Sequence, residues 1–126
     1  NDARKGVSMF KKENINVPVL GIIENMAYFT PKELPENKYY LFGKEGAKNL
    51  SLDLRIPFLG EIPIIQSVRE AADFGRPAAM QESTISEEIF KKVSKNMLSQ
   101  LLIRNKELPE TEIVKITTMS GCISQK

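Results

Sequence analysis

Few residues in this 126-residue sequence are of the types that carry out catalysis on their own. The absence of histidine removes the commonest general base and a common metal ligand. A single cysteine, Cys122, excludes an internal disulfide framework. Glu33 and Glu36 could together bind a metal ion, but solvated loop charges are the better interpretation of this pair. The sequence therefore predicts neither histidine-based catalysis nor a metal site.

Phosphate chemistry needs a glycine-rich loop. Its backbone N–H groups and a lysine neutralise the phosphates, while a hydroxyl and a carboxylate hold magnesium. Residues 43–47 read Gly-Lys-Glu-Gly-Ala, a weak glycine pair without the Gly-Lys-Ser/Thr ending of such a loop. We interpret this segment as the start of a helix and assign it no phosphate role.

Two short segments place a polar residue or apolar residues where a ligand could bind. Asn25 follows the apolar run 17–23, and Pro63 and Ile64 follow the apolar run 58–62. In open α/β sheets, ligands lie outside the carboxyl ends of the strands. The amide of Asn25 has one acceptor oxygen and two donor hydrogens, which suit a ligand edge but can also satisfy nearby backbone. For Pro63 and Ile64, simple loop packing is the competing interpretation.

The pattern around these segments predicts strands that alternate with helices. The unbroken apolar run 17–23 indicates a central strand of a parallel sheet, covered on both faces, and 58–62 indicates a second strand. Between the two strands, residues 25–43 form a long loop rich in aromatic residues. Helical patterns occupy residues 3–13, 44–54 and 67–74 and the segment from residue 84 onward.

Two capping boxes mark the starts of helices. Ser67 with Glu70, and Thr84 with Glu87, have the Ser/Thr-x-x-Glu spacing of N-terminal capping residues. Glu87 is also predicted to pair with Lys91 across one helical turn. After the second box, apolar residues recur at every fourth position and predict the buried face of a long helix: Ile85, Ile89, Val93, Met97 and Leu101.

This order of elements indicates an α/β fold with a parallel sheet, since parallel neighbours need crossover connections. Two strands cannot complete a doubly wound sheet, so we expect the missing strands upstream of Asn1 or in a partner chain. The sequence also begins without methionine, and we expect it to be a fragment. Residues 1–108 are predicted to form the folded portion, and residues 109–126 a C-terminal tail or edge strand.

Four short segments form a recognisable series. They read Val-Leu-Gly-Ile-Ile-Glu-Asn-Met-Ala-Tyr-Phe (19–29), Phe-Gly-Lys-Glu-Gly-Ala (42–47), Ile-Pro-Phe-Leu-Gly-Glu-Ile-Pro (56–63), and Val-Arg-Glu-Ala (68–71) leading to Gly-Arg-Pro (75–77). In this order and spacing they resemble Mrp/ApbC-type iron–sulfur cluster carrier ATPases, which are deviant P-loop NTPases of the MinD/ParA class. The resemblance implies that residues 1–108 are the C-terminal portion of such a domain, with a parallel sheet and helices on both faces.

The resemblance also implies a nucleotide site. In that family the asparagine at the position of Asn25 hydrogen-bonds the adenine edge, and Pro63 and Ile64 would pack against the flat base. The implied cofactors are ATP and Mg²⁺, bound by a full-length ATPase that forms a nucleotide-dependent homodimer. Because no phosphate loop occurs in these 126 residues, the upstream half of the domain should carry the chemistry, and this chain alone should be inactive.

Mrp/ApbC proteins commonly carry a Cys-x-x-Cys pair in the loop after the Glu-Asn-Met segment, where two subunits share an iron–sulfur cluster through thiolates. Here residues 30–35 read Thr-Pro-Lys-Glu-Leu-Pro, so this loop lacks the cluster ligands. The lone Cys122 cannot replace a pair of cysteines. An alternative function is therefore a non-catalytic protein-interaction module that uses the aromatic loop from Tyr28 to Phe42.

Composition limits the remaining partners. The 18 basic and 16 acidic residues are mixed along the chain, so no charged block suggests nucleic acid or an anionic membrane surface. No apolar run is long enough for a membrane span, and no signal segment is evident. We therefore expect a cytoplasmic protein. The resemblance implies as its partners the upstream half of its domain, a second copy and an iron–sulfur client.

Overall fold

The computed structural model describes residues 2–112, which divide between two compact units. In the described part of the first unit, α1 (Asp2–Phe10) precedes a segment that runs to Pro18. This helix confirms the pattern predicted at 3–13, although it ends earlier, and Val7 is its buried residue. Most of the predicted tail or edge strand at 109–126 lies outside the described residues.

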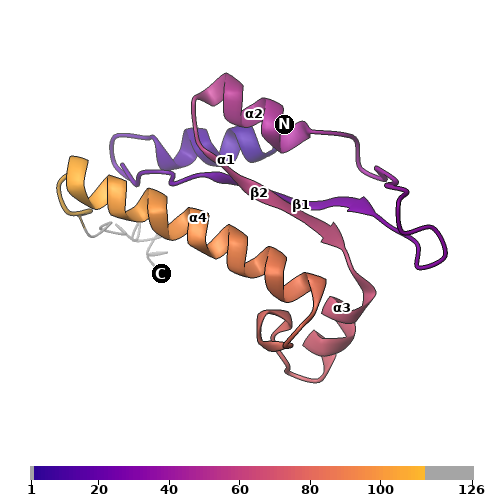
Figure 1. Cartoon of the computed structure of the whole chain (residues 1–126). Coiled ribbons are helices and arrows are strands. Elements are labelled where there is room, and N and C mark those ends of the chain that lie inside the picture. Colours follow the sequence, from indigo (N-terminus) through magenta and orange to yellow (C-terminus); the bar gives the residue numbers. More distant parts are fainter. Residues whose placement is uncertain (1, 113–126) are drawn as a thin grey trace, which may run out of the picture. The chain divides into compact units, whose positions relative to one another are not determined.

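The second unit is built around two parallel strands (Figure 1). β1 (Ile22–Phe29) pairs with β2 (Phe58–Ile64), and α2 (Gly46–Leu54) lies between them in sequence. A helical crossover is what two parallel neighbours require. The strand–helix–strand order and the parallel pairing confirm the predicted α/β fold class.

The boundaries of β1 differ from the prediction. The predicted strand ended at Ile23, whereas β1 begins at Ile22 and continues to Phe29. Pro18 has no N–H to donate to a ladder, and residues 17–21 are half-buried without joining β1. The polar residue Glu24 fits inside the strand because its carboxylate has a partner in α2. The prediction of a central strand covered on both faces is therefore not met within residues 2–112, where residues 17–22 are half-buried, Ile23 is 39% exposed and β1 has one partner strand.

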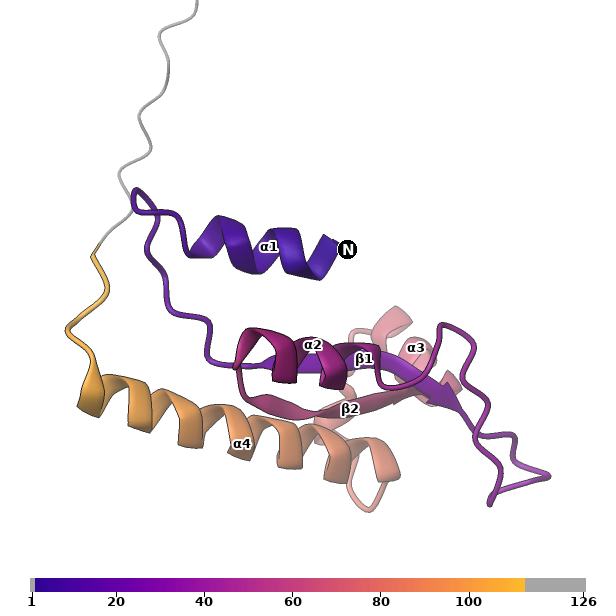
Figure 2. The same cartoon turned by 90° about the horizontal axis from the view of Figure 1, so that it is seen from above.

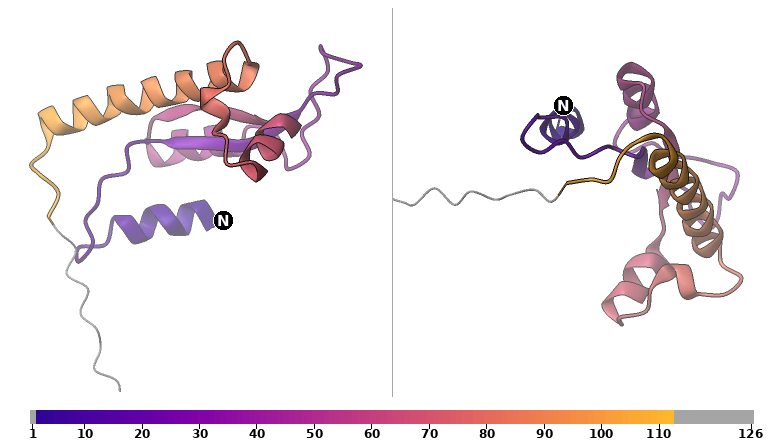
Figure 3. Two further views of the ribbon diagram at one scale, coloured as in Figure 1. Left: turned by 90° about the horizontal axis from the view of Figure 1, so that it is seen from below. Right: turned by 90° about the vertical axis from the view of Figure 1, so that its left-hand side faces the viewer.

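Helices lie on different sides of the strand pair (Figures 1 and 2). α2 contacts β1, and α4 (Ile85–Glu107) contacts β2. In Figure 3 (right), where the strands are viewed nearly end-on, the two helices are again separated by the strands. No helix among residues 2–112 combines the length and the apolarity needed to cross a membrane.

The contact between α4 and β2 is close at two points. A Cβ atom on Gly60 would lie 3.0 Å from Cγ2 of Val93, so the missing side chain lets the helix approach the strand. One residue earlier in β2, the carbonyl of Leu59 accepts a hydrogen bond from Nδ2 of Asn96 at 2.8 Å. Leu59 and Val93 are both buried, so this contact forms part of the core.

The buried face of α4 differs in part from the predicted one. Val93 is buried as predicted, but Ile85 is 72% exposed and Ser86 is buried in its place. A helix has 3.6 residues per turn, so each step of four residues advances the side chain by about 40° around the axis. A strict repeat of four over 16 residues therefore drifts away from one face.

Of the two predicted capping boxes, the structure confirms one. Thr84 Oγ1 accepts a hydrogen bond from the N–H of Glu87 at 3.1 Å, and Thr84 is the N-cap of α4. The prediction for Ser67 is wrong, because α3 (Gln66–Asp73) starts one residue before it and has Ile65 at its N-cap. A short 3₁₀ helix, η1 (Ala78–Met80), connects α3 to α4.

Candidate functional site

The parallel pairing places the predicted site residues on two neighbouring strands. Asn25 is the register partner of Ile62, and Phe29 is the register partner of Ile64. The expectation that Asn25 and Pro63 follow the strands is wrong, since both lie within them. Both strands continue further than the predicted segments, so Asn25 is the fourth of eight residues in β1 and Pro63 is the sixth of seven in β2.

Asn25 lies at an irregularity of β1. Its side chain is exposed, and its Oδ1 accepts a hydrogen bond from the N–H of Met26 at 3.0 Å. Met26 has a φ of 55°, and the register shifts between Asn25 and Phe29. The alternative of a side chain that satisfies local backbone is therefore present in the structure. The Asn25 amide retains one oxygen lone pair and both N–H donors for a ligand, because none of these has a partner within residues 2–112.

Pro63 and Ile64 differ in accessibility. Pro63 is buried inside β2, where its missing N–H is tolerated because the described sheet has only two strands and β2 is an edge strand. Ile64, the last residue of β2, is half-buried and keeps part of its apolar surface accessible. In this conformation Ile64, rather than Pro63, offers a surface to a flat ligand.

Glu24 is a residue of this site that the sequence pattern did not identify. Its Oε1 accepts a hydrogen bond from the N–H of Gly46 at 2.9 Å. Gly46 is the first residue of α2, so the carboxylate lies at a helix N-terminus, where negative charge is favourable. A half-buried glutamate inside an apolar strand requires a hydrogen-bonding partner, and that requirement is the signal that could have identified it.

The aromatic loop folds back onto the end of β1. Phe29 and Tyr39 exchange two backbone hydrogen bonds of 2.8 Å each. The rings of Tyr28 and Tyr40 meet edge to face, with centroids 6.2 Å apart. Lysine ammonium groups lie over both rings, Lys38 at 4.1 Å from the Tyr28 centroid and Lys44 at 5.4 Å from the Tyr40 centroid.

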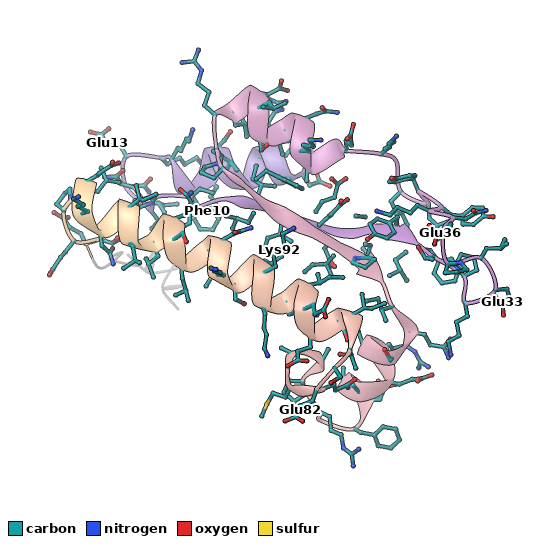
Figure 4. The ribbon with its side chains drawn as sticks, in the orientation of Figure 1. Phe10, Glu13, Glu33, Glu36, Glu82 and Lys92 are labelled. Atoms are coloured by element: carbon teal, nitrogen blue, oxygen red, sulfur yellow. The ribbon has the colours of Figure 1, made fainter. Side chains whose placement is uncertain are left out.

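Charged groups near this end of the sheet are solvated. Glu33 and Glu36 lie in the loop beyond β1, and both are exposed (Figure 4). A hydrogen bond from Lys48, at 3.1 Å, lowers the pKa of Glu45 at the N-cap of α2. Within residues 2–112, no group of three or more histidine, cysteine, aspartate and glutamate side chains could hold a metal ion.

The relatives of this chain are named for the transfer or carriage of iron or iron–sulfur clusters. The model of the ParA family described as NUBPL iron-transfer P-loop NTPase matches residues 1–98. The iron–sulfur cluster transfer protein NUBPL of Dictyostelium discoideum is 40% identical and covers 84% of this chain. The iron–sulfur cluster carrier protein of the Synechocystis strain PCC 6803 is 43% identical and covers 64% of this chain.

A solved structure is also similar. It is a nucleotide-binding protein from Archaeoglobus fulgidus in complex with ADP, with 36% sequence identity and a TM-score of 0.51. The similarity covers 59% of this chain and 29% of that protein. The chain likewise spans 32% of the Dictyostelium protein and 22% of the Synechocystis protein. On the match over residues 1–98, together with the parallel strand pair, this chain belongs to the ParA family of NUBPL-type iron-transfer P-loop NTPases.

Proposed function

We propose that this chain supplies the base-reading edge of an ATP site in a longer iron–sulfur carrier protein. The observation that carries this proposal is the Asn25 amide, which is exposed where the regular pairing of the two parallel strands ends and whose N–H donors have no partner within residues 2–112. The relative of known structure from Archaeoglobus fulgidus was solved with ADP, which supports a nucleotide as the ligand.

The chemistry of the amide suits adenine. The adenine edge presents an amino donor next to a ring-nitrogen acceptor, and the Asn25 amide presents an oxygen next to an NH₂ group. A carbonyl oxygen has two lone pairs, so Asn25 can accept from Met26 and from adenine together. The exposed part of Ile64 would pack against the base, and Pro63 would support it from inside β2.

The phosphates and Mg²⁺ require residues beyond those of this chain. No Gly-Lys-Ser/Thr loop occurs among the 126 residues, and the relatives named above are three to five times as long as the part they share with it. We propose that the upstream half of the same domain binds the phosphates and Mg²⁺ and performs hydrolysis. This chain alone should then be inactive as an ATPase.

Calorimetric titration with ATP and Mg²⁺ tests the proposal, on this chain and on a longer polypeptide that adds an upstream half. We expect only the longer polypeptide to bind. In it, Asn25→Ala should weaken binding by about 1–3 kcal/mol, because a buried polar contact is lost. Asn49→Ala, at an exposed position of α2, is the matched control and should leave the affinity unchanged. If Asn25→Ala binds ATP as tightly as the unmodified protein, the base-reading role is wrong.

The iron–sulfur role is proposed for the whole protein. The names of the relatives support cluster transfer. We further propose a second copy and an iron–sulfur client as partners. Because residues 30–35 contain no cysteine, any cluster would need ligands outside this loop.

A second candidate is a protein-interaction module built on the aromatic loop. Leu41 and Phe42 are 62% and 73% exposed, on a loop that is held against β1 by backbone and ring contacts. Replacing both with serine should reduce the mass of any assembly measured by light scattering. Leu52→Ser, at a similarly exposed position of α2, is the control. An unchanged assembly mass would exclude this candidate.

A further inference from the structure

Regular pairing between β1 and β2 is interrupted on both sides of Asn25. Three consecutive residues of β1, from Ile23 to Asn25, pair in step with Gly60, Glu61 and Ile62. The register shifts between Ile22 and Ile23, and it shifts again between Asn25 and Phe29. None of these three residues of β1 is buried, so the burial of one face does little to fix their register.

The position of Asn25 depends on that register. Successive side chains of a strand point to opposite faces, so Glu24 points toward α2 and Asn25 points away from it. A slip of one residue would exchange the two faces and turn the Asn25 amide toward α2. Between Asn25 and Phe29, β1 has two residues more than the facing part of β2, and Met26, with its positive φ, lies in this irregularity directly after Asn25.

Glu24 ties this stretch to another element. Its carboxylate accepts the N–H of Gly46 at 2.9 Å, across 22 residues of sequence. Glu45, just before Gly46, has a φ of 56°, so the backbone turns sharply and presents the first N–H of α2 to β1. A carboxylate that bonds a helix N-terminus forms a stronger hydrogen bond than a neutral acceptor does.

We infer that Glu24 is a positioning residue for nucleobase recognition. Its hydrogen bond to α2 holds the register of β1, and thereby keeps Asn25 on the ligand side of the strand. The inference rests on the proposed adenine-reading role of Asn25. Glu24 itself faces away from the ligand, so it acts only through its neighbour.

Titrations of the longer polypeptide with ATP and with GTP test the inference. Glu24→Asp keeps the charge but shortens the side chain by one methylene, which breaks the bond to Gly46. We expect it to weaken ATP binding about tenfold, the loss typical of one charged hydrogen bond, and to leave GTP binding unchanged. Glu24→Gln keeps an acceptor oxygen at the same reach and should restore most of the affinity for ATP.

A double variant distinguishes a role of Glu24 in positioning Asn25 from a general effect of Glu24 on the stability of the fold. If Glu24 acts through Asn25, then Glu24→Asp should have no further effect on ATP binding when Asn25→Ala is already present. Equal weakening of ATP and GTP, or additive losses in the double variant, would overturn the inference and leave the role of Asn25 standing. Unchanged ATP affinity of Asn25→Ala would overturn both.

Hydrogen exchange provides a second measurement that does not depend on nucleotide. In Glu24→Asp the amide of Gly46 should exchange faster than in the unmodified protein because it loses its acceptor, and the amides of the paired stretch from Ile23 to Asn25 should also exchange faster as the register loosens. Unchanged exchange in the stretch from Ile23 to Asn25 would show that the hydrogen bond does not hold the strand, and would also overturn the inference.

Discussion

Gly21 lies where the chain enters β1, close to the buried side chain of Leu59 in β2. A Cβ atom on Gly21 would lie between 2.4 and 2.7 Å from three carbon atoms of Leu59. Leu59 is 5% exposed, so it has little room to move. The absent side chain therefore allows the segment before β1 to pass over the core.

We expect Gly21→Ala to lower the free energy of unfolding by about 1–3 kcal/mol, through overpacking against Leu59. Urea denaturation measures this change. Gly6→Ala is the matched control, because a Cβ atom there would have no neighbour within 4 Å. In the middle of α1 the control should be neutral, or stabilising by up to about 1 kcal/mol. Equal effects of the two substitutions would contradict the close approach at Gly21.

Glu87 stabilises the start of α4 in its charged form. Its carboxylate accepts hydrogen bonds from Lys91 at 2.6 Å, as the pairing across one turn predicted, and from the N–H of Ser83 at 2.8 Å. The bond from Lys91 is the largest cause of its pKa being lower than the ordinary value of 4.5. A lowered pKa in the folded state stabilises the fold above pH 4.5, and this contribution is lost as the pH falls through the folded pKa.

We therefore expect the stability difference between the unmodified protein and Glu87→Gln to be constant at neutral pH and to shrink below about pH 4.5. Thermal unfolding between pH 3 and pH 7, roughly the window that spans the carboxylate pKa, measures it. Lys91→Gln should reduce the difference, whereas Lys92→Gln, one residue further along α4, should not. A difference that stays constant down to the lowest pH would contradict this assignment.

Helix α4 and helix α3 have the same Ser/Thr-x-x-Glu motif near their starts but different N-caps. At α4 the Thr84 hydroxyl accepts the N–H of Glu87, and it also donates to the carbonyl of Gln81 at 2.8 Å. At α3 the helix begins before Ser67, and Gln66 bonds Glu70 through its side chain at 2.6 Å. The course of the chain as it leaves β2, rather than the local sequence motif, decides where α3 begins.

This contrast predicts unequal effects of two similar substitutions. Thr84→Ala should destabilise the fold by about 1 kcal/mol, the usual cost of an N-cap. Ser67→Ala should change stability by less than about 0.5 kcal/mol, because Ser67 lies inside the helix, where alanine is favoured. Chemical denaturation of the two variants compares them directly. A larger loss for Ser67→Ala would show that it caps α3 in solution.

The second unit as a whole exposes strand edges and apolar side chains. Its described sheet consists of β1 and β2 alone, and Ile23, the second residue of β1, is 39% exposed. Exposed strand edges readily pair with another chain. This arrangement is consistent with a chain that spans 32% of its Dictyostelium relative, in which further residues are available to cover the sheet.

We expect this chain in isolation to self-associate, with a mass that rises with concentration in light scattering. Ile23→Lys places a charge on the exposed edge of β1 and should shift the equilibrium toward monomer. Leu102→Lys, at a 70% exposed position of α4, is the control for the added charge. A stable monomer across concentrations would contradict the prediction.

The sequence alone determined the α/β class, the order of the elements and the long helix capped by Thr84. Helical periodicity, helix-breaking glycine and proline residues, and capping hydrogen bonds are local properties of the sequence. It also singled out Asn25, through a resemblance to a family that the match over residues 1–98 supports. The adenine-reading role of Asn25 stays a prediction.

Only the tertiary structure decided which residues pair and which faces are buried. The apolar run 17–23 suggested the wrong boundaries for β1, because pairing depends on partner strands and on donors that Pro18 lacks. The bond from Glu24 to Gly46 joins residues 22 positions apart, so no local pattern contains it. Ile85 is 72% exposed and Ser86 is buried, so the packing of the elements, and not the repeat of four residues alone, decides which face of α4 is covered.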